Sequence, residues 1–411
     1  MRHRSLLILT TAVAAGALTL SACGSRGEDK SGDGSKATVV IGLDAPLTGE
    51  LSALGQGIKN SADLAVKNAN KQNEVDGVTF ELRPLDDKAL PNAGQQNATK
   101  LAGDKEVLGI VGPLNSGVAQ SMQQVAQSNG VTLISPANTT PDLTQGKNWK
   151  KNDRKRQFST YFRTATTDEV QGAFDGQYAY EKMKAKTAYV IDDQKTYGVG
   201  LASSFKDQFT KLGGKIVGTE HVSPDDRDFK AVVAKAKSAN PDLVFYGGEY
   251  PASGPLSQQL KDGGLDAPLM GGDGMYSADY IELNKKAQGD YASSVGKPVE
   301  QLPSAKKFIE DYKAAGYKDR YEAYGGSTYD ATWAIIQAVK QVVADNNGKL
   351  PDDARKKVVD AMNKVSFDGV TGKVAFDKYG DTTNTMITAY QVDNKQWKAR
   401  FSAEFEKFDK S

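Results

Sequence analysis

Cysteine and histidine are scarce in this sequence, and neither sign of charge dominates it. Cysteine occurs once in 411 residues and histidine twice, so an internal disulfide and a histidine-rich metal site are both excluded. His221 is the only histidine after residue 3, which disfavours catalytic sets built on histidine. The 52 basic and 51 acidic residues balance, so electrostatics gives no reason to expect nucleic acid as a partner. We therefore expect no metal ion, no cofactor and no enzymatic activity.

Long apolar runs are also missing, except near the start of the chain. Arg, His and Arg at positions 2–4 precede a mostly apolar run over residues 6–20. At about 15 residues this run is shorter than the ~20 that cross a bilayer as a helix, and the pattern is typical of a signal peptide. It ends on Leu20-Ser21-Ala22-Cys23, which resembles the lipobox of bacterial lipoproteins. An ordinary secretory signal with an incidental cysteine is the alternative.

The lipobox resemblance implies a location for the protein. Cleavage would remove residues 1–22 as a signal peptide, and fatty acylation (palmitate) of Cys23 would anchor the new N-terminus, since two acyl chains hold a protein stably on a membrane. Residues 24–36 contain Gly, Ser and charged residues but no large apolar side chain. We therefore expect residues 23–36 to be a flexible tether and the folded part to lie on the extracytoplasmic face of the cell membrane.

Strand-like runs alternate with helical patterns through the rest of the chain. The predicted strands are Val39–Leu43, Phe80–Leu85, Leu108–Val111, Thr132–Ile134, Thr187–Asp192, Ile216–Glu220 and Leu243–Tyr246. Apolar residues at helical spacing lie between them, for example within residues 58–69. This alternation predicts an α/β fold with mostly parallel sheets. The roughly 375 residues after the tether exceed one compact core and predict two lobes.

The loops after the strands carry the candidate binding residues, because ligands of parallel sheets bind beyond the carboxyl ends of the strands. Ser116 begins a predicted helix, where free N–H groups and the helix dipole favour a carboxylate. The loop from Ser135 to Thr140 offers further hydroxyl and amide groups. Asp273, which lies between glycines, could supply the opposite charge for an ammonium group. These loops therefore predict a site for a small zwitterion.

Each candidate also has an ordinary structural interpretation. Ser116 and Thr139 could only cap a helix or a turn, and Asp273 could only stabilise its own turn. Tyr197 and Tyr324 could border an apolar pocket, although a lone tyrosine more often contributes to packing. No single residue is specific, so the prediction depends on their order along the chain.

The loop sequences, taken in order, resemble those of a known family. They are Ser135-Pro136-Ala137-Asn138-Thr139-Thr140-Pro141, Lys195-Thr196-Tyr197-Gly198, Tyr246-Gly247-Gly248 and Gly271-Gly272-Asp273-Gly274. They are similar to the loops of the leucine/isoleucine/valine-binding family, the extracytoplasmic substrate-binding proteins of ABC importers. The resemblance extends from Thr38 to about Gln391.

The resemblance implies two αβα lobes joined by three crossovers, the type I periplasmic-binding-protein fold. The implied segments are 37–164 and 293–380 for lobe 1, and 165–292 and 381–411 for lobe 2. The protein would be a monomer that captures an amino acid, branched-chain or related, in the cleft between the lobes. It would then deliver this ligand to an ABC permease and its ATPase subunits.

The resemblance also assigns roles to single residues. The matching positions are Ser116, Ala137 (through its backbone), Asn138 and Thr139 around the ligand carboxylate, Asp273 at the ammonium, and Tyr197 and Tyr324 beside the ligand.

Three positions depart from the family pattern. Leu54 replaces an aromatic residue, Asn115 replaces a cysteine, and Glu249 replaces a tyrosine. Glu249 adds a carboxylate, so we include it among the candidate binding residues. It could favour a ligand with a second donor group or a different side chain, or it could point to solvent or pair with a lysine. Recognition of the amino-acid head group is therefore better supported than recognition of a branched aliphatic side chain.

Other interpretations remain open. The same lobes could be a sensor that passes occupancy to a membrane receptor, or could bind another small amino-acid-like, amide or aromatic-acid ligand. An exported hydrolase would depend on Ser116 or on the carboxylates of Asp273 and Glu249, but no GxSxG motif surrounds Ser116. The basic loop at residues 147–156 could contact anionic lipid or cell-wall polymer, or could be a solvated surface insertion.

Overall fold

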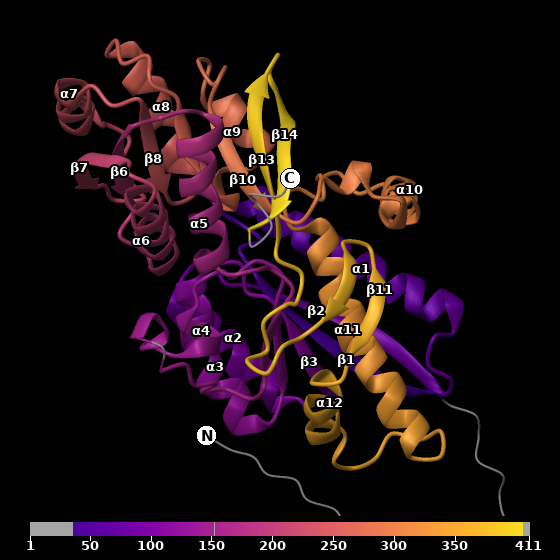
Figure 1. Ribbon diagram of the computed structural model, residues 1–411. Helices are drawn as coiled ribbons and strands as arrows, with labels where there is room; N and C mark the ends of the chain where they lie inside the picture. The colour runs from indigo at the N-terminus through magenta and orange to yellow at the C-terminus, as the bar shows by residue number, and fades with distance from the viewer. Residues whose placement is uncertain (1–35, 152, 406–411) are drawn as a thin grey trace, which may run out of the picture. The chain divides into compact units, whose positions relative to one another are not determined.

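The computed structural model describes residues 36–151 and 153–405, so Cys23, the predicted signal peptide and nearly all of the predicted tether lie outside the described residues. None of the helices within these ranges has the length and hydrophobicity that a bilayer crossing requires. The strands form two large sheets, one in each lobe, as the α/β prediction requires (Figure 1).

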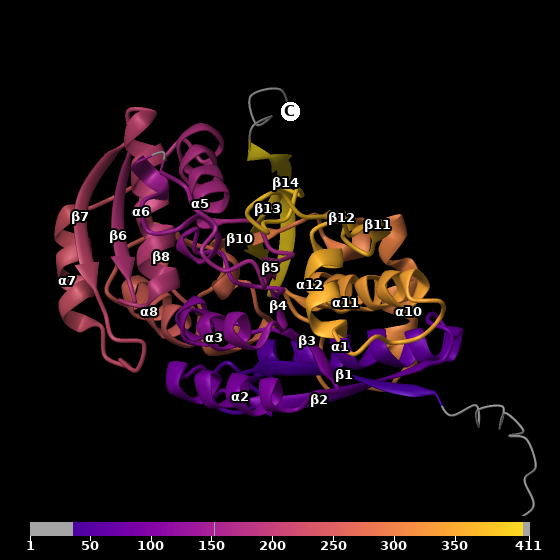
Figure 2. The same cartoon turned by 90° about the horizontal axis from the view of Figure 1, so that it is seen from below.

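The sheet of lobe 1 has five parallel strands. They are β1 (Ala37–Ala45), β2 (Val78–Asp86), β3 (Val107–Val111), β4 (Thr132–Ser135) and β5 (Tyr161–Arg163), in the order β2-β1-β3-β4-β5. Helices α1 (Ser52–Gln72), α11 (Gly325–Asp345) and α12 (Ala354–Met362) cover one face, and α2 (Pro91–Gly103) and α3 (Ser116–Asn129) cover the other (Figure 2). The period of two places Val39 and Ile41 on the first face and Val40 on the second.

The sheet of lobe 2 has seven strands and is mixed. They are β6 (Thr187–Asp192), β7 (Lys215–His221), β8 (Leu243–Gly247), β9 (Leu269–Gly271), β10 (Tyr291–Val295), β13 (Met386–Asp393) and β14 (Gln396–Glu404), in the order β14-β13-β10-β9-β8-β6-β7. Helices α5 (Asp168–Gln177) and α6 (Thr196–Lys211) pack on one face. The other face is covered by α7 (Lys230–Ala239), α8 (Tyr250–Asp262) and α9 (Ala278–Leu283). β13 is antiparallel to both of its neighbours, β10 and β14, and the other pairings of this sheet are parallel.

The chain passes from one sheet to the other after Arg163, after Val295 and before Met386. The return segment includes α10 (Lys306–Ala314), α11, α12 and the small hairpin of β11 (Ser366–Gly369) and β12 (Gly372–Ala375). β10 stays in the lobe 2 sheet through Val295, whereas the predicted segment ends at residue 292. The strand bounds show where the chain leaves each sheet but do not define the lobe boundaries, so the segment ends at 164, 292 and 380 stay predictions.

A buried ion pair joins the first and third crossovers. Arg163, at the end of β5, donates to Asp381 over 2.6 Å, and its side chain is fully buried. The same guanidinium donates to the carbonyl oxygens of Asn138 (3.2 Å) and Thr140 (2.8 Å). The crossovers thus hold the loop after β4, which carries several of the candidate binding residues.

Candidate functional site

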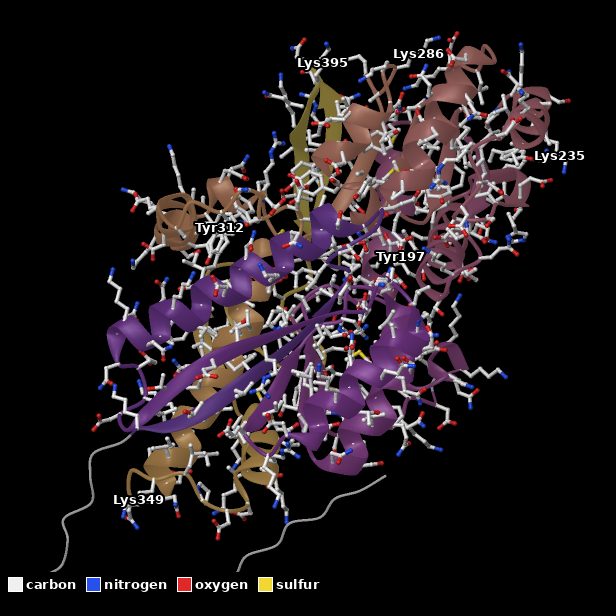
Figure 3. All side chains as sticks on the ribbon, turned by 180° about the vertical axis from the view of Figure 1, so that it is seen from behind. Tyr197, Lys235, Lys286, Tyr312, Lys349 and Lys395 are labelled. Carbon is white, nitrogen blue, oxygen red and sulfur yellow. The ribbon has the colours of Figure 1, made fainter. Side chains whose placement is uncertain are left out.

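The loops after β3, β4, β6, β8 and β9 meet between the two lobes and enclose a cavity of about 20 Å³. Figure 3 shows Tyr197 at this junction, close to the ribbons of both lobes. The residues that line the cavity are Leu54, Leu114, Asn115, Ser116, Ala137, Tyr197, Glu249, Gly274 and Tyr324. The structure therefore brings together predicted residues that lie more than two hundred positions apart in the chain.

Lobe 1 contributes neutral groups to this site. Ser116 is buried as the first residue of α3, as predicted. The Ser135 hydroxyl accepts from the backbone N–H groups of Ala137 (3.1 Å) and Asn138 (2.8 Å), which fixes the loop after β4. The Ala137 N–H thus already has a partner, a restriction that the sequence did not reveal. Thr139 is fully buried; its hydroxyl makes no well-formed hydrogen bond to a described residue, but it lies beside the Asp168 carboxyl and opposes the rise in the pKa of that group.

Asn138 lies behind the cavity and is not one of its lining residues. Its amide donates to the carbonyl oxygen of Leu114 over 2.7 Å and accepts from the hydroxyl of Tyr161 over 2.8 Å. The side chain therefore joins the loop after β4 to the loop after β3 at one end and to strand β5 at the other. In this structure Asn138 positions its neighbours.

Lobe 2 contributes a buried carboxylate, Asp273, at the start of a short 3₁₀ turn after β9. Tyr197 at the start of α6 donates to one carboxylate oxygen over 2.8 Å, and Tyr324 of lobe 1 donates to the other over 3.0 Å. Burial raises the pKa of Asp273, although the two tyrosine donors oppose the rise. The protein alone therefore stabilises the ionised form of Asp273 poorly, and a cation beside this carboxylate would be favoured.

Glu249, after β8, is also buried against the cavity rather than turned to solvent. It accepts from the Asn115 amide of lobe 1 over 2.7 Å and from the Lys195 ammonium of lobe 2 over 2.9 Å. Burial disfavours the charged form of Lys195, yet the Glu249 carboxylate raises the pKa of Lys195 above its ordinary value. Burial and Glu249 together raise the pKa of Asp193 to about 8.

Close approach of the lobe 2 loops requires glycine at two positions. A Cβ atom on Gly198 would lie 2.4 Å from the carbonyl oxygen of Gly247, and one on Gly247 would lie 2.1 Å from that of Gly198. These glycines let the start of α6 pack against the end of β8. Tyr197 and Glu249 consequently face the same cavity.

Sequence reasoning missed several members of the site. Asn115 stands out in the sequence only as a departure from the family, and Lys195 only as part of a loop motif. The position of Asn115 directly before Ser116 was the signal that could have identified it. Asp168 was not singled out, yet it is fully buried at the start of α5, and its N–H donates to the carbonyl oxygen of Thr139 over 2.7 Å. Burial raises the pKa of Asp168 to about 7. Its position after the first crossover was the available signal.

Further contacts between the lobes lie around the cavity. The hydroxyl of Tyr250 donates to the carbonyl oxygen of Glu50. In the basic loop, Lys150 pairs with Asp207 of α6 and Arg154 pairs with Glu169 of α5, both over 2.6 Å. The basic loop of lobe 1 is therefore partly neutralised by acids of lobe 2. No cluster of His, Cys, Asp and Glu suited to a metal ion occurs within residues 36–151 and 153–405.

Comparison with known proteins identifies a family. A family model described as periplasmic binding protein matches residues 38–396. The Leu/Ile/Val-binding protein homolog 3 of Brucella melitensis is 32% identical over 364 residues, which cover 87% of this chain and 92% of that protein.

Solved structures give the same result. The branched-chain amino acid transporter substrate-binding protein LivJ of Streptococcus pneumoniae, solved with isoleucine, is 27% identical with a TM-score of 0.79, over 89% of this chain and 99% of that one. The leucine-binding protein LivK of Thermotoga maritima is 27% identical with a TM-score of 0.78 and the same coverage. The chain therefore belongs to the periplasmic binding protein family, in its Leu/Ile/Val-binding branch.

Proposed function

We propose that the protein binds an α-amino acid, branched-chain or related, between its lobes and delivers it to an ABC importer. The observation that carries this proposal is the pairing of opposite chemistries at one junction of the lobes, where Ser116 lines the cavity and Asp273, outside the lining, is bonded to the lining residues Tyr197 and Tyr324. Neutral donors at the start of α3 suit a carboxylate, and the buried acid Asp273 suits an ammonium group. The names of its relatives support the same class of ligand.

Binding requires the lobes to separate. A cavity of about 20 Å³ has room for about one water molecule, which is far less than an amino acid needs. The bonds from Asn115 to Glu249 and from Tyr324 to Asp273 join the lobes across this cavity. Ligand entry must therefore break or rearrange these bonds, and the ligand stabilises the closed form by its differential affinity for it.

Calorimetric titration with the twenty amino acids tests the proposal. The protein is unfolded, freed of any bound ligand and refolded before the measurement. We expect one molecule of at least one amino acid to bind per chain. If none of the twenty produces heat or a rise in melting temperature, the proposal is wrong.

We also propose the finer features of the protein's setting. It is a monomer without enzymatic activity, with a signal peptide over residues 1–22 and a lipid anchor on Cys23, a residue outside the described ranges. Lobe 1 comprises residues 37–164 and 293–380, and lobe 2 comprises residues 165–292 and 381–411. Replacement of Cys23 by serine should release the protein from the membrane fraction without changing its ligand affinity. Retention on the membrane would contradict the anchor.

A further inference from the structure

Two polar residues of opposite lobes meet on the wall of the cavity. The Asn115 amide donates to one oxygen of Glu249 over 2.7 Å, and Lys195 binds the other oxygen over 2.9 Å. Both Asn115 and Glu249 line the cavity, and Glu249 is only 7% exposed. A carboxylate and an amide thus occupy one flank of the space that the proposed amino acid would enter.

The hydrogen-bonding capacity of this flank is not used up. The amide oxygen of Asn115 is buried and has no partner among the described residues. The carboxylate oxygens of Glu249 accept one bond each from Asn115 and Lys195, and the neighbouring Asp193, whose pKa is raised to about 8, shares a further hydrogen bond with Glu249. An ionised carboxylate can accept about four bonds in total, so capacity for another donor is left. Asn115 and Glu249 together offer more acceptor than donor positions, whether or not their mutual bond survives ligand entry. A ligand therefore complements this flank with a donor.

The remaining lining is mostly apolar or aromatic. Leu54 and Leu114 are buried apolar residues of the same cavity, and Tyr324 closes another side. An aliphatic side chain would fit this apolar part, but it would leave the amide oxygen of Asn115 buried without a hydrogen-bond donor. Sites built to hydrogen-bond a substrate group discriminate strongly against analogues that lack it, because the buried polar group of the site then loses its partner.

We infer that the ligand side chain donates a hydrogen bond to Asn115 and Glu249. The inference rests on the proposed function, because it assumes that the head group binds at Ser116 and Asp273. Asparagine and threonine meet the requirement, since they match leucine and valine in shape and carry a donor.

Matched pairs of amino acids test this inference on the refolded full-length protein. We expect L-asparagine to bind at least about tenfold more tightly than L-leucine, or L-threonine at least about tenfold more tightly than L-valine, as expected for one well-placed hydrogen bond. Equal or tighter binding of both aliphatic members would overturn the inference and leave the proposed function intact. Binding by none of the four, nor by any other amino acid, would overturn both.

Variants locate the source of the preference. Asn115→Leu and Glu249→Leu should each reduce the ratio between the polar and aliphatic members to below about threefold. Asn129→Leu changes an exposed residue at the far end of the same helix as a control and should keep the ratio. An undiminished ratio in both cavity variants would overturn the inference, and melting temperatures show which variants fold. The wild-type ratio decides the question if a variant does not fold.

Discussion

The two lobes approach the cavity with different chemistry. At the cavity wall, lobe 1 presents the amide of Asn115 and the hydroxyl of Ser116, and lobe 2 presents the carboxylate of Glu249. Thr139 of lobe 1 and Asp273 of lobe 2 are buried outside the lining, and Asp273 is bonded to the lining residues Tyr197 and Tyr324. Neutral donors at a helix start stabilise an anion without placing a cation in the interior. An ammonium group needs a buried anion, and this must be stabilised by neighbouring donors such as the tyrosines at Asp273.

The difference also appears in the buried carboxyl groups next to the cavity. Burial raises carboxyl pKa values in both lobes, including those of Asp44 and Asp87 in lobe 1. In lobe 2, Asp273 accepts from the lining residues Tyr197 and Tyr324, and the lining residue Glu249 adds to the effect of burial in raising the pKa of Asp193. A cationic group between the lobes would therefore stabilise the ionised carboxyl groups of lobe 2.

The largest effect is expected from substitution of a charged residue of lobe 2. Asp273→Asn should weaken amino-acid binding by roughly 30- to several-thousand-fold, because one member of a buried charge pair is lost. Calorimetry measures the change. Asp266→Asn makes the same substitution at an exposed position of lobe 2 and should leave affinity unchanged. A loss below about threefold for Asp273→Asn would remove this residue from the site.

A smaller effect is expected from substitution of a neutral residue of lobe 1. Thr139→Val removes a hydroxyl that makes no well-formed hydrogen bond to a described residue and acts only on the Asp168 carboxyl, so it should leave the melting temperature nearly unchanged. Ligand affinity should fall about 10- to 150-fold, the range for a hydrogen bond to a charged group. Thr132 is equally buried, and its hydroxyl also makes no hydrogen bond to a described residue. Thr132→Val is therefore the matched control, and equal affinities of the two variants would contradict the role of Thr139.

The smallest effect concerns stability and pH. Because the pKa of Asp168 is about 7 in the folded protein, against an ordinary value of 3.8, the folded state keeps a proton that the unfolded chain releases above about pH 4. The free energy of unfolding should therefore fall as pH rises from about 4 to 7. Asp168→Asn should flatten this fall by on the order of 1 kcal/mol per pH unit.

Denaturant unfolding at pH 5, 6 and 7 measures the slopes for Asp168→Asn and the wild type. Identical slopes for the two proteins would show that Asp168 releases its proton equally in both states. Ionisation of Asp168 in lobe 2 would then not destabilise the folded protein, contrary to the prediction.

The parallel core of both sheets could be predicted from the sequence, because buried strands such as Leu108–Val111 and Leu243–Tyr246 are short runs without charged residues that are followed by glycine. The β13–β14 hairpin was not predicted. Its turn places Asn394 and Lys395 at φ angles of 52° and 59°, and a lysine at such a position gives a much weaker hairpin signal than glycine.

The site was predicted in part for a similar reason. Loop position sufficed to select Ser116, Tyr197 and Asp273, because the carboxyl ends of parallel strands meet at one edge. Pairings across the lobes, such as Asn115 with Glu249, depend on how the sheets are placed and leave no local pattern. The side chain of Asn138 forms hydrogen bonds with two such long-range partners, so the sequence could not show that its amide group is already hydrogen-bonded within the protein.

The most direct test of the division between the lobes combines one variant with one ligand change. Whichever of L-leucine and L-asparagine binds more tightly is compared with its deaminated acid, 4-methylpentanoate or succinamate, in the wild type and in Asp273→Asn. We predict that loss of the ammonium group weakens binding at least about 30-fold in the wild type and less than about threefold in the variant. Equal losses in both proteins would show that Asp273 does not receive the ammonium group and would contradict the account.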